Sequence, residues 1–217
     1  MTSRSDIGDE TVALVSEEPE EESSFEVVGA DEAGISVLDR GFLYGDAVFE
    51  TLRCYGSEPA FLGEHVDLLN SSLERLGFGI EVETSEARLW VEEMLAQLPD
   101  ATDGDHDDAY VRLCVTRGRR SGLLEPTEAR PTLVCIAKGL IRRRYPSASC
   151  EVVGTRRPRG VVGELKTHNY LPNVLAKSEA GDVDEALMRN SEGEIASGAV
   201  SNLFVLRDGV LRTSRRE

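Results

Sequence analysis

The stretch DRGFLYGDAVFETLR, at residues 39–53, carries the most specific pattern in this chain, with the groups RGF, YGD and FE separated by one or two variable positions. Two later stretches are as distinctive: ELKTHNYLPNVLAKSEA at 164–180 and GEIASGAVSNLFVLRDGVLRT at 193–213. The motifs GxxxxGK[ST], GxGxxG, HExxH and GxSxG do not occur, which excludes the simplest nucleotide-binding, metalloprotease and hydrolase assignments. Fold and function therefore have to be inferred from these three stretches and their surroundings.

The composition describes an acidic protein with enough apolar residues for a core. The 217 residues include 40 Asp and Glu against 24 Lys and Arg, a net charge of −16, and 40% of them are hydrophobic. This charge disfavours nucleic acid and anionic membranes as partners. The scarcity of lysine is compatible with a halophilic source and equally with an ordinary acidic cytosolic protein. Because no apolar run reaches about 18 residues and no signal peptide is evident, we expect a soluble, cytoplasmic protein.

The cysteines and histidines do not predict a metal site. The four cysteines are far apart in the sequence, and Cys114 and Cys135 lie in apolar runs, where a buried free thiol is the usual outcome. The three histidines show no ligand spacing, so we predict no metal.

Hydrophobic periodicity predicts the elements of the first half of the chain. The acidic residues 1–24 are predicted to be disordered, and residues 25–140 to form an N-terminal α+β domain. Helices are predicted from two segments with apolar residues at helical spacing, and strands from two β-type runs. The predicted helices cover 62–76, ended by Gly77, and 85–98, burying some or all of Leu89, Trp90, Met94 and Leu95; the strands cover 109–116 and 131–137. The acidic residues 99–108 are expected to form a solvated loop.

The second half has its own element pattern, after an arginine-rich linker predicted at 141–149. Residues 150–217 are predicted to form a C-terminal cofactor domain. Its elements are a strand at 150–154, a helix at 170–180, a strand at 185–189 and a hairpin that turns at Asp208–Gly209. Because the sequence ends directly after a hairpin strand, whose edge has no obvious cover, we expect this domain to be truncated.

In order and content, the three stretches resemble the fold type IV pyridoxal-phosphate enzymes, which include branched-chain and D-amino-acid aminotransferases and aminodeoxychorismate lyase. The resemblance extends from about Gly34 to Thr213. It implies an α/β (α+β) fold with a small N-terminal α+β domain and an incomplete C-terminal β-rich pseudo-barrel domain. It further implies pyridoxal 5'-phosphate as the cofactor, an amino acid or keto acid as the substrate, and a homodimer.

The cofactor lysine is predicted to be Lys166, which would form a Schiff base and later move a proton at the substrate carbon. The chain offers only two other lysines. Lys177 lies among polar residues of a predicted helix and is expected at the surface, and Lys138 is expected to be a loop charge beside Gly139. Lys166 is placed at a strand-to-helix junction and matches the lysine of the family.

Other site positions follow from the resemblance. Arg112 lies where some members bind the substrate carboxylate, a task that suits a bidentate guanidinium, although a structural ion pair is the alternative. Phe49 stands at an aromatic lining position, with core packing as the alternative. Ser197, Ser201 and Asn202 stand near the expected cofactor positions. A framework role is predicted for Asp39, Arg40, Tyr44, Asp46 and Glu50, and a solvated or substrate-facing loop for Arg119 and Arg120.

The sequence departs from the family pattern in three respects. Ser197 replaces a glutamate that pairs with the pyridine nitrogen, and Leu68 replaces an arginine that reaches the phosphate. Family members also continue into a glycine-initiated helix that binds the phosphate. A transaminase and a lyase both remain compatible with the retained residues. The alternatives are a truncated or degenerate, catalytically inactive family member and an acidic binding protein of unrelated fold.

Overall fold

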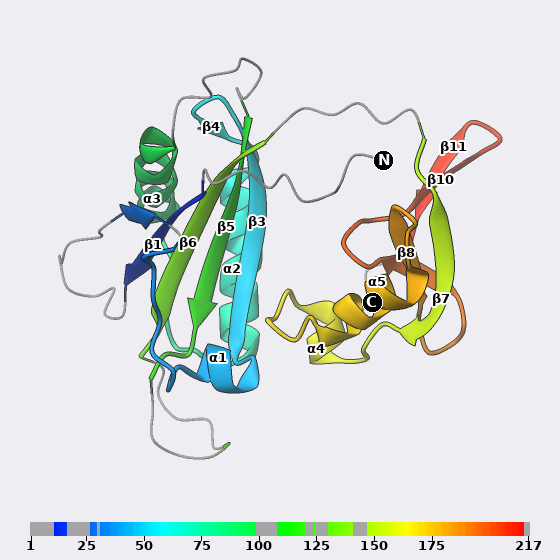
Figure 1. The fold of residues 1–217 in the computed structure, drawn as a ribbon, viewed down its shortest axis with the longest axis horizontal. Coiled ribbons are helices and arrows are strands. Elements are labelled where there is room, and N and C mark those ends of the chain that lie inside the picture. Colours follow the sequence, from blue (N-terminus) through cyan, green and yellow to red (C-terminus); the bar gives the residue numbers. More distant parts are fainter. Residues whose placement is uncertain are drawn as a thin grey trace. The chain divides into compact units, whose positions relative to one another are not determined.

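A computed structural model describes most of the chain, which forms two compact units, Met1–Arg142 and Arg143–Glu217 (Figure 1). The mixed α+β, two-domain fold predicted from the sequence is confirmed. Most of the predicted linker and of the acidic loop after Leu98 lies outside the described residues. The described residues are 11–16, 27–29, 31–98, 108–119, 124, 130–140 and 147–214.

Unit 1 is built on a six-stranded sheet with the order β2-β1-β6-β5-β3-β4. Its centre is an antiparallel trio in which β5 pairs along its whole length with both β3 and β6. These strands are rich in β-branched and apolar residues, which favour a pleated, buried surface. The strand bounds are β1 Thr11–Ser16, β2 Val27–Gly29, β3 Ala47–Tyr55, β4 Glu58–Pro59, β5 Asp108–Thr116 and β6 Thr132–Leu140.

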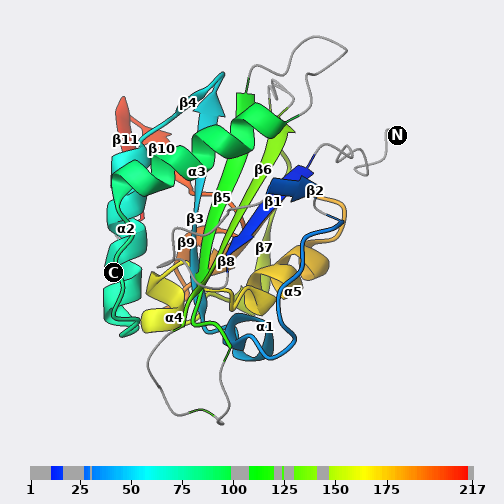
Figure 2. The same ribbon diagram turned by 90° about the vertical axis from the view of Figure 1, so that its left-hand side faces the viewer.

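Two amphipathic helices cover one face of this sheet. Helix α2 (Leu62–Arg75) packs beside β3 and helix α3 (Thr84–Gln97) beside β6, and Figure 2 shows α3 crossing in front of the strands. Both predicted helices are confirmed, and α3 buries Trp90 and Met94 while Leu89 is exposed. The core of unit 1 is the apolar layer between these helices and the sheet.

Strand β1 departs from the predicted disorder of residues 1–24. Thr11–Ser16 (TVALVS) pairs with β6 over six residues, so ordered structure begins well before Phe25. The physical reason is that a short β-type run satisfies its backbone by pairing with the free edge of β6, whatever the charge of its flanks. The rest of that segment lies outside the described residues.

Unit 2 contains a three-stranded sheet and a separate hairpin. Strand β7 (Cys150–Arg156) runs parallel to β8 (Glu185–Arg189), which pairs antiparallel with β9 (Ile195–Gly198). The crossover between β7 and β8 contains α4 (Val161–Glu164) and α5 (Leu171–Ala180). Small residues let α5 approach the sheet closely. The core residues are Val153, Ala176, Ala180, Ala186, Met188 and Ala199.

The hairpin confirms the strongest turn signal in the sequence. Strands β10 (Phe204–Arg207) and β11 (Val210–Thr213) are joined by Asp208 and Gly209, with φ values of 53° and 76°. Two positive φ values are what a type I′ turn requires, and Asp-Gly supplies them at low strain. The predicted strand and helix positions in unit 2 are likewise confirmed within two residues at each end.

Candidate active site

Unit 2 contains a pocket of about 210 Å³ among its described residues. Its walls come from the end of β7, the segment through α4 to the start of α5, β9, and the turn that follows β9. The polar and charged side chains that line it include Arg157, Lys166, Tyr170, Asn173, Ser197, Ser201 and Asn202.

Lys166 is the one lysine that lines this pocket. It lies between α4 and α5, so the residue precedes a helix as predicted but follows a short helix rather than a strand. Lys177 donates hydrogen bonds to the carbonyl oxygens of Val183 and Asp184, at 3.3 and 2.7 Å, and so joins the end of α5 to the loop before β8. Lys177 therefore has a structural role, whereas Lys166 is the lysine found among the residues that line this pocket.

The turn after β9 is held in place by side chains that the sequence did not single out. Asn173 on α5 donates a hydrogen bond of 2.6 Å to the carbonyl of Ala199. Ser201 Oγ donates a hydrogen bond of 2.6 Å to Glu185 Oε2, and both atoms lie where a β-carbon of residue 198 would otherwise be. A β-carbon at Gly198 would lie 2.3 Å from Ser201 Oγ, so glycine is needed for this close approach. Ser197 and Asn202 are thus presented on a constrained turn.

The charge of the pocket lining is opposite to that of the whole chain. Arg157 and Lys166 contribute two cations, and Glu164 is the one acidic residue among the lining residues. Arg157 is further positioned by α4, because its Nη2 and Nε donate to the carbonyl of Gly163 at 2.7 and 3.2 Å. The sequence analysis did not select Arg157, because the run RRPRG at 156–160 matches no motif. Two cations with hydroxyl and amide groups suit an anionic ligand that also needs a reactive amine.

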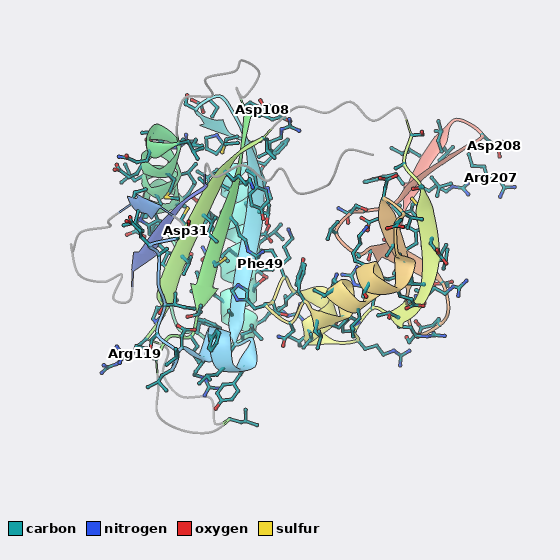
Figure 3. The ribbon with its side chains drawn as sticks, in the orientation of Figure 1. Asp31, Phe49, Asp108, Arg119, Arg207 and Asp208 are labelled. Carbon is teal, nitrogen blue, oxygen red and sulfur yellow. The ribbon has the colours of Figure 1, made fainter. Side chains whose placement is uncertain are left out.

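The two predicted substrate residues of unit 1 lie against each other. The guanidinium carbon of Arg112 lies 3.7 Å from the ring centroid of Phe49, and Arg112 Nε donates to Cys114 Sγ at 3.3 Å. All three residues project from the face of the sheet that α2 and α3 do not cover, as the strand register and the composition of the core show. Figure 3 labels Phe49 on β3. Leu68, which replaces the expected arginine, is exposed on α2.

Charged residues of the 39–53 stretch form a buried network around α1 (Arg40–Tyr44). Asp39 caps this helix by accepting from Gly41 N at 2.7 Å and also accepts from Thr116 Oγ1 at 2.6 Å. Asp46 Oδ2 accepts from Arg40 Nε at 2.9 Å and from Arg117 Nε at 2.8 Å. The contacts support the framework role predicted for this stretch.

The same network extends to α2 and to the loop after β5. Arg117 donates to the carbonyls of Leu76 and Gly77 beyond α2. Glu50 Oε2 lies 2.9 Å from His65 Nδ1, and Arg40 lies over the Tyr44 ring. Arg119 is exposed and its backbone forms an isolated antiparallel β-bridge with that of Asp39, while Arg120 lies outside the described residues.

The described residues contain neither a metal-binding cluster nor a membrane-spanning helix. No group of His, Cys, Asp and Glu there is arranged to hold a metal ion. No helix there is long and apolar enough to cross a membrane. Burial raises the pKa of the Cys114 thiol, an effect that neighbouring Arg112 partly offsets.

Comparison with known proteins identifies the family. The family model for amino-transferase class IV matches residues 47–217. The chain belongs to the class IV aminotransferase family, whose members depend on pyridoxal 5'-phosphate.

Individual relatives include both aminotransferases and a lyase. The chain is 36% identical over 193 residues to a putative branched-chain-amino-acid aminotransferase of Methanocaldococcus jannaschii, covering 86% of this chain and 65% of the relative. It is 34% identical to aminodeoxychorismate lyase of Bacillus subtilis, covering 80% and 59% respectively. The chain therefore spans less than two thirds of the length of these relatives.

Solved structures agree with this assignment. The branched-chain aminotransferase of Thermoproteus uzoniensis matches with a TM-score of 0.75 and 25% identity, over 95% of this chain and 68% of that one. The 4-amino-4-deoxychorismate lyase of Pseudomonas aeruginosa matches with a TM-score of 0.68 and 29% identity, over 92% and 68%.

Proposed function

We propose that this protein is a pyridoxal-phosphate-dependent aminotransferase or aminodeoxychorismate lyase that acts on an amino-acid-type substrate through Lys166. The observation that carries the proposal is the position of Lys166, the one lysine in a pocket whose cationic and hydroxyl lining suits an anionic cofactor. The family match, which includes this segment, supports the same assignment.

The residues of the pocket have separate roles in this proposal. Bound pyridoxal phosphate supplies an electron sink for the charge that develops at the substrate α-carbon. Lys166 Nζ holds the cofactor covalently and then moves a proton at the α-carbon. Ser201 and Asn202, on the constrained turn, are assigned to the cofactor phosphate. Ser197 would offer the pyridine nitrogen a neutral hydrogen-bonding group, and it would supply no carboxylate charge to keep that nitrogen protonated.

Phe49 and Arg112 are assigned to the substrate. The guanidinium of Arg112 lies over the ring of Phe49 in a cation–π contact, and this contact fixes the orientation of the guanidinium. An oriented guanidinium binds a carboxylate through two parallel hydrogen bonds. Removing the ring, as in Phe49→Ala, should therefore raise the KM for a carboxylate substrate more than it lowers kcat.

A homodimer is part of the proposal. The segment before and within α1 exposes the apolar side chains of Val37, Leu38, Phe42 and Leu43, with 71%, 55%, 65% and 45% of their surfaces accessible. Exposed apolar side chains gathered in one short segment favour a protein–protein contact. Light scattering of the purified chain tests the dimer, and Phe42→Asp should shift it towards the monomer.

Covalent trapping tests the role of Lys166. The purified chain is mixed with pyridoxal phosphate, reduced with borohydride and digested, and the modified peptide is located by mass spectrometry. We expect modification at Lys166 and a visible absorbance band that disappears in Lys166→Ala. Lys177→Gln is the matched control and should retain both signals. Modification of Lys177 alone, or no lysine-dependent band, would leave the catalytically inactive alternative as the better description.

Product analysis separates the two activities. A transaminase passes the amino group to a keto acid, whereas the lyase releases pyruvate from aminodeoxychorismate. The relatives include proteins of both kinds, so both possibilities are kept in the proposal. Pyruvate formed without an added keto acid acceptor would identify the lyase.

A further inference from the structure

Strand β7 is irregular near its C-terminal end. Its parallel pairing with β8 is regular from Cys150 to Val152, and the register then shifts before Arg156 pairs with Arg189. Val152 and Arg156 are four positions apart, whereas their partners Leu187 and Arg189 are two positions apart. Strand β7 therefore contains a bulge. A bulge leaves backbone groups without ladder partners and changes the direction of the side chains that follow it.

The carboxylate of Glu179, in the last turn of α5, binds the backbone of this bulge. Helix α5 packs against β7 (Figure 1). Glu179 Oε1 accepts a hydrogen bond of 2.5 Å from the Gly154 amide, and Oε2 accepts from the Thr155 amide at 2.9 Å and from the Thr155 hydroxyl at 2.8 Å. These hydrogen bonds lower the pKa of the Glu179 carboxyl. One side chain thus satisfies two backbone donors of the bulge.

Gly154 leaves the space that this carboxylate occupies. A β-carbon at residue 154 would lie 2.9 Å from Glu179 Oε1, and its nearest neighbours would all be carboxyl atoms of Glu179. Gly154 is not among the glycines with positive φ, so its backbone conformation is one that alanine also adopts. Gly154→Ala therefore displaces the carboxylate without removing its charge.

Arg157 follows the bulge directly and lines the pocket. Its amide donates to the carbonyl of Arg189 at 3.0 Å, which fixes its backbone to the end of β8. Its side chain donates through Nη2 and Nε to the carbonyl of Gly163 in α4. The direction in which this guanidinium leaves the strand is therefore set by the conformation of the two residues bound to Glu179.

We propose that Glu179 is a positioning residue that holds Arg157 in the pocket lining by closing the β7 bulge from the end of α5. The inference rests on the proposed function, in which Arg157 and Lys166 serve an anionic ligand. Glu179 does not line the pocket, so it acts through the backbone of residues 154 and 155. A guanidinium that is already held in place loses less conformational entropy when it binds an anion, so closure of the bulge strengthens binding.

Binding of pyridoxal phosphate to the purified full chain tests this role in Gly154→Ala, which keeps every charge of the protein. We expect the Kd, measured from the absorbance change of the cofactor, to rise about fivefold or more, because the Arg157 contact with the anion is weakened. Glu179→Ala should raise the Kd by a similar factor. Glu151→Ala removes an exposed carboxylate from the same strand and should change the Kd less than about twofold.

A double-mutant cycle with Arg157→Ala separates positioning from a general loss of stability. Once residue 157 is alanine, Gly154→Ala should change the Kd less than about twofold, because the side chain that the bulge positions is gone. Losses that simply multiply in the double variant would overturn the proposal. A lower Tm with an unchanged Kd in Gly154→Ala would overturn it too, since the carboxylate would then only attach α5 to β7.

Hydrogen exchange of the Arg157 Nε–H in the chain without cofactor gives a readout that does not depend on the proposed function. Followed by NMR, this proton should exchange about tenfold faster in Gly154→Ala and in Glu179→Ala than in the wild type, because its bond to the Gly163 carbonyl opens more often. Unchanged exchange in both variants, or failure of both to fold, would refute the positioning role. Wild-type chain that shows this exchange pattern but binds no pyridoxal phosphate would contradict the proposed function alone.

Discussion

Asp46 offers the sharpest test of how the 39–53 stretch supports the fold. The same carboxylate oxygen, Asp46 Oδ2, accepts hydrogen bonds from both Arg40 Nε and Arg117 Nε, at 2.9 and 2.8 Å. The side chains of Arg40 and Arg117 are only 6% and 4% exposed, whereas that of Asp46 is 18% exposed. Asp46→Ala therefore leaves two buried guanidinium groups facing each other without the anion between them.

The size of the effect follows from that burial. Removing one partner from a buried ion pair costs about 3–5 kcal/mol. We expect about 3 kcal/mol, at the lower end, because Asp46 is partly hydrated and Arg117 keeps its bonds to the carbonyls of Leu76 and Gly77. With a denaturant slope of about 2 kcal/mol/M, that loss lowers the urea midpoint by about 1.5 M.

Trp90 makes the measurement selective for unit 1. It is the single tryptophan of the chain and is buried in the core of that unit, so its fluorescence follows the unfolding of unit 1. Asp46→Asn keeps an oxygen acceptor, so its free energy of unfolding should fall by roughly half as much as that of Asp46→Ala. As a control, Glu92→Ala removes an exposed ion pair with Arg88 on α3 and should change the free energy of unfolding by about 0.5 kcal/mol or less. A loss under about 1 kcal/mol in Asp46→Ala would refute the reasoning.

Three further outcomes follow from side chains outside this network. Glu179→Gln should speed amide exchange at Thr155, because the Glu179 carboxylate accepts hydrogen bonds from the Gly154 and Thr155 amides and from the Thr155 hydroxyl, which lower its pKa. The stability that these bonds contribute is fully present above pH 4.5 and is lost as the pH falls through the lowered pKa of Glu179 in the folded chain. At pH 8 a thiol reagent should label exposed Cys150 in the folded chain but not Cys54, whose pKa burial raises to about 11, as peptide mapping would show. Asn70→Ala removes two hydrogen bonds of 2.9 Å that tie α2 to the segment before α3, and urea unfolding should show a loss of about 2 kcal/mol.

Local pattern was sufficient for the elements whose apolar spacing is regular. The helix at Leu62–Arg75 follows directly from apolar residues three and four positions apart, and the β10–β11 hairpin follows from Asp208–Gly209. Strand β1 was missed because its acidic surroundings dominated the composition, although its own six residues are of strand type. What decides its structure is the unpaired edge of β6, and no local pattern contains that information.

Pairing information also explains which site residues could be predicted. Lys166 and the turn at Ser201 lie within recognisable stretches, so resemblance located them. Arg157 and Asn173 reach the pocket only because β7, α5 and the turn after β9 meet in space. Lys138 was taken for a loop charge because Gly139 follows it, and its burial becomes visible only when β5 is placed beside β6.

The contacts separate charged residues that build the fold from those that have binding capacity left. Within the 39–53 stretch, Arg40 and Asp46 are bound to each other or to Arg117, so their charges are already compensated inside the protein. Arg112 lacks a carboxylate partner among the described residues, and Lys138 Nζ lacks any hydrogen-bond partner there. Since a cation already paired internally gains little from a ligand, Arg112 and Lys138 keep more binding capacity than Arg40 and Arg117, even though the stretch at 39–53 contains neither Arg112 nor Lys138.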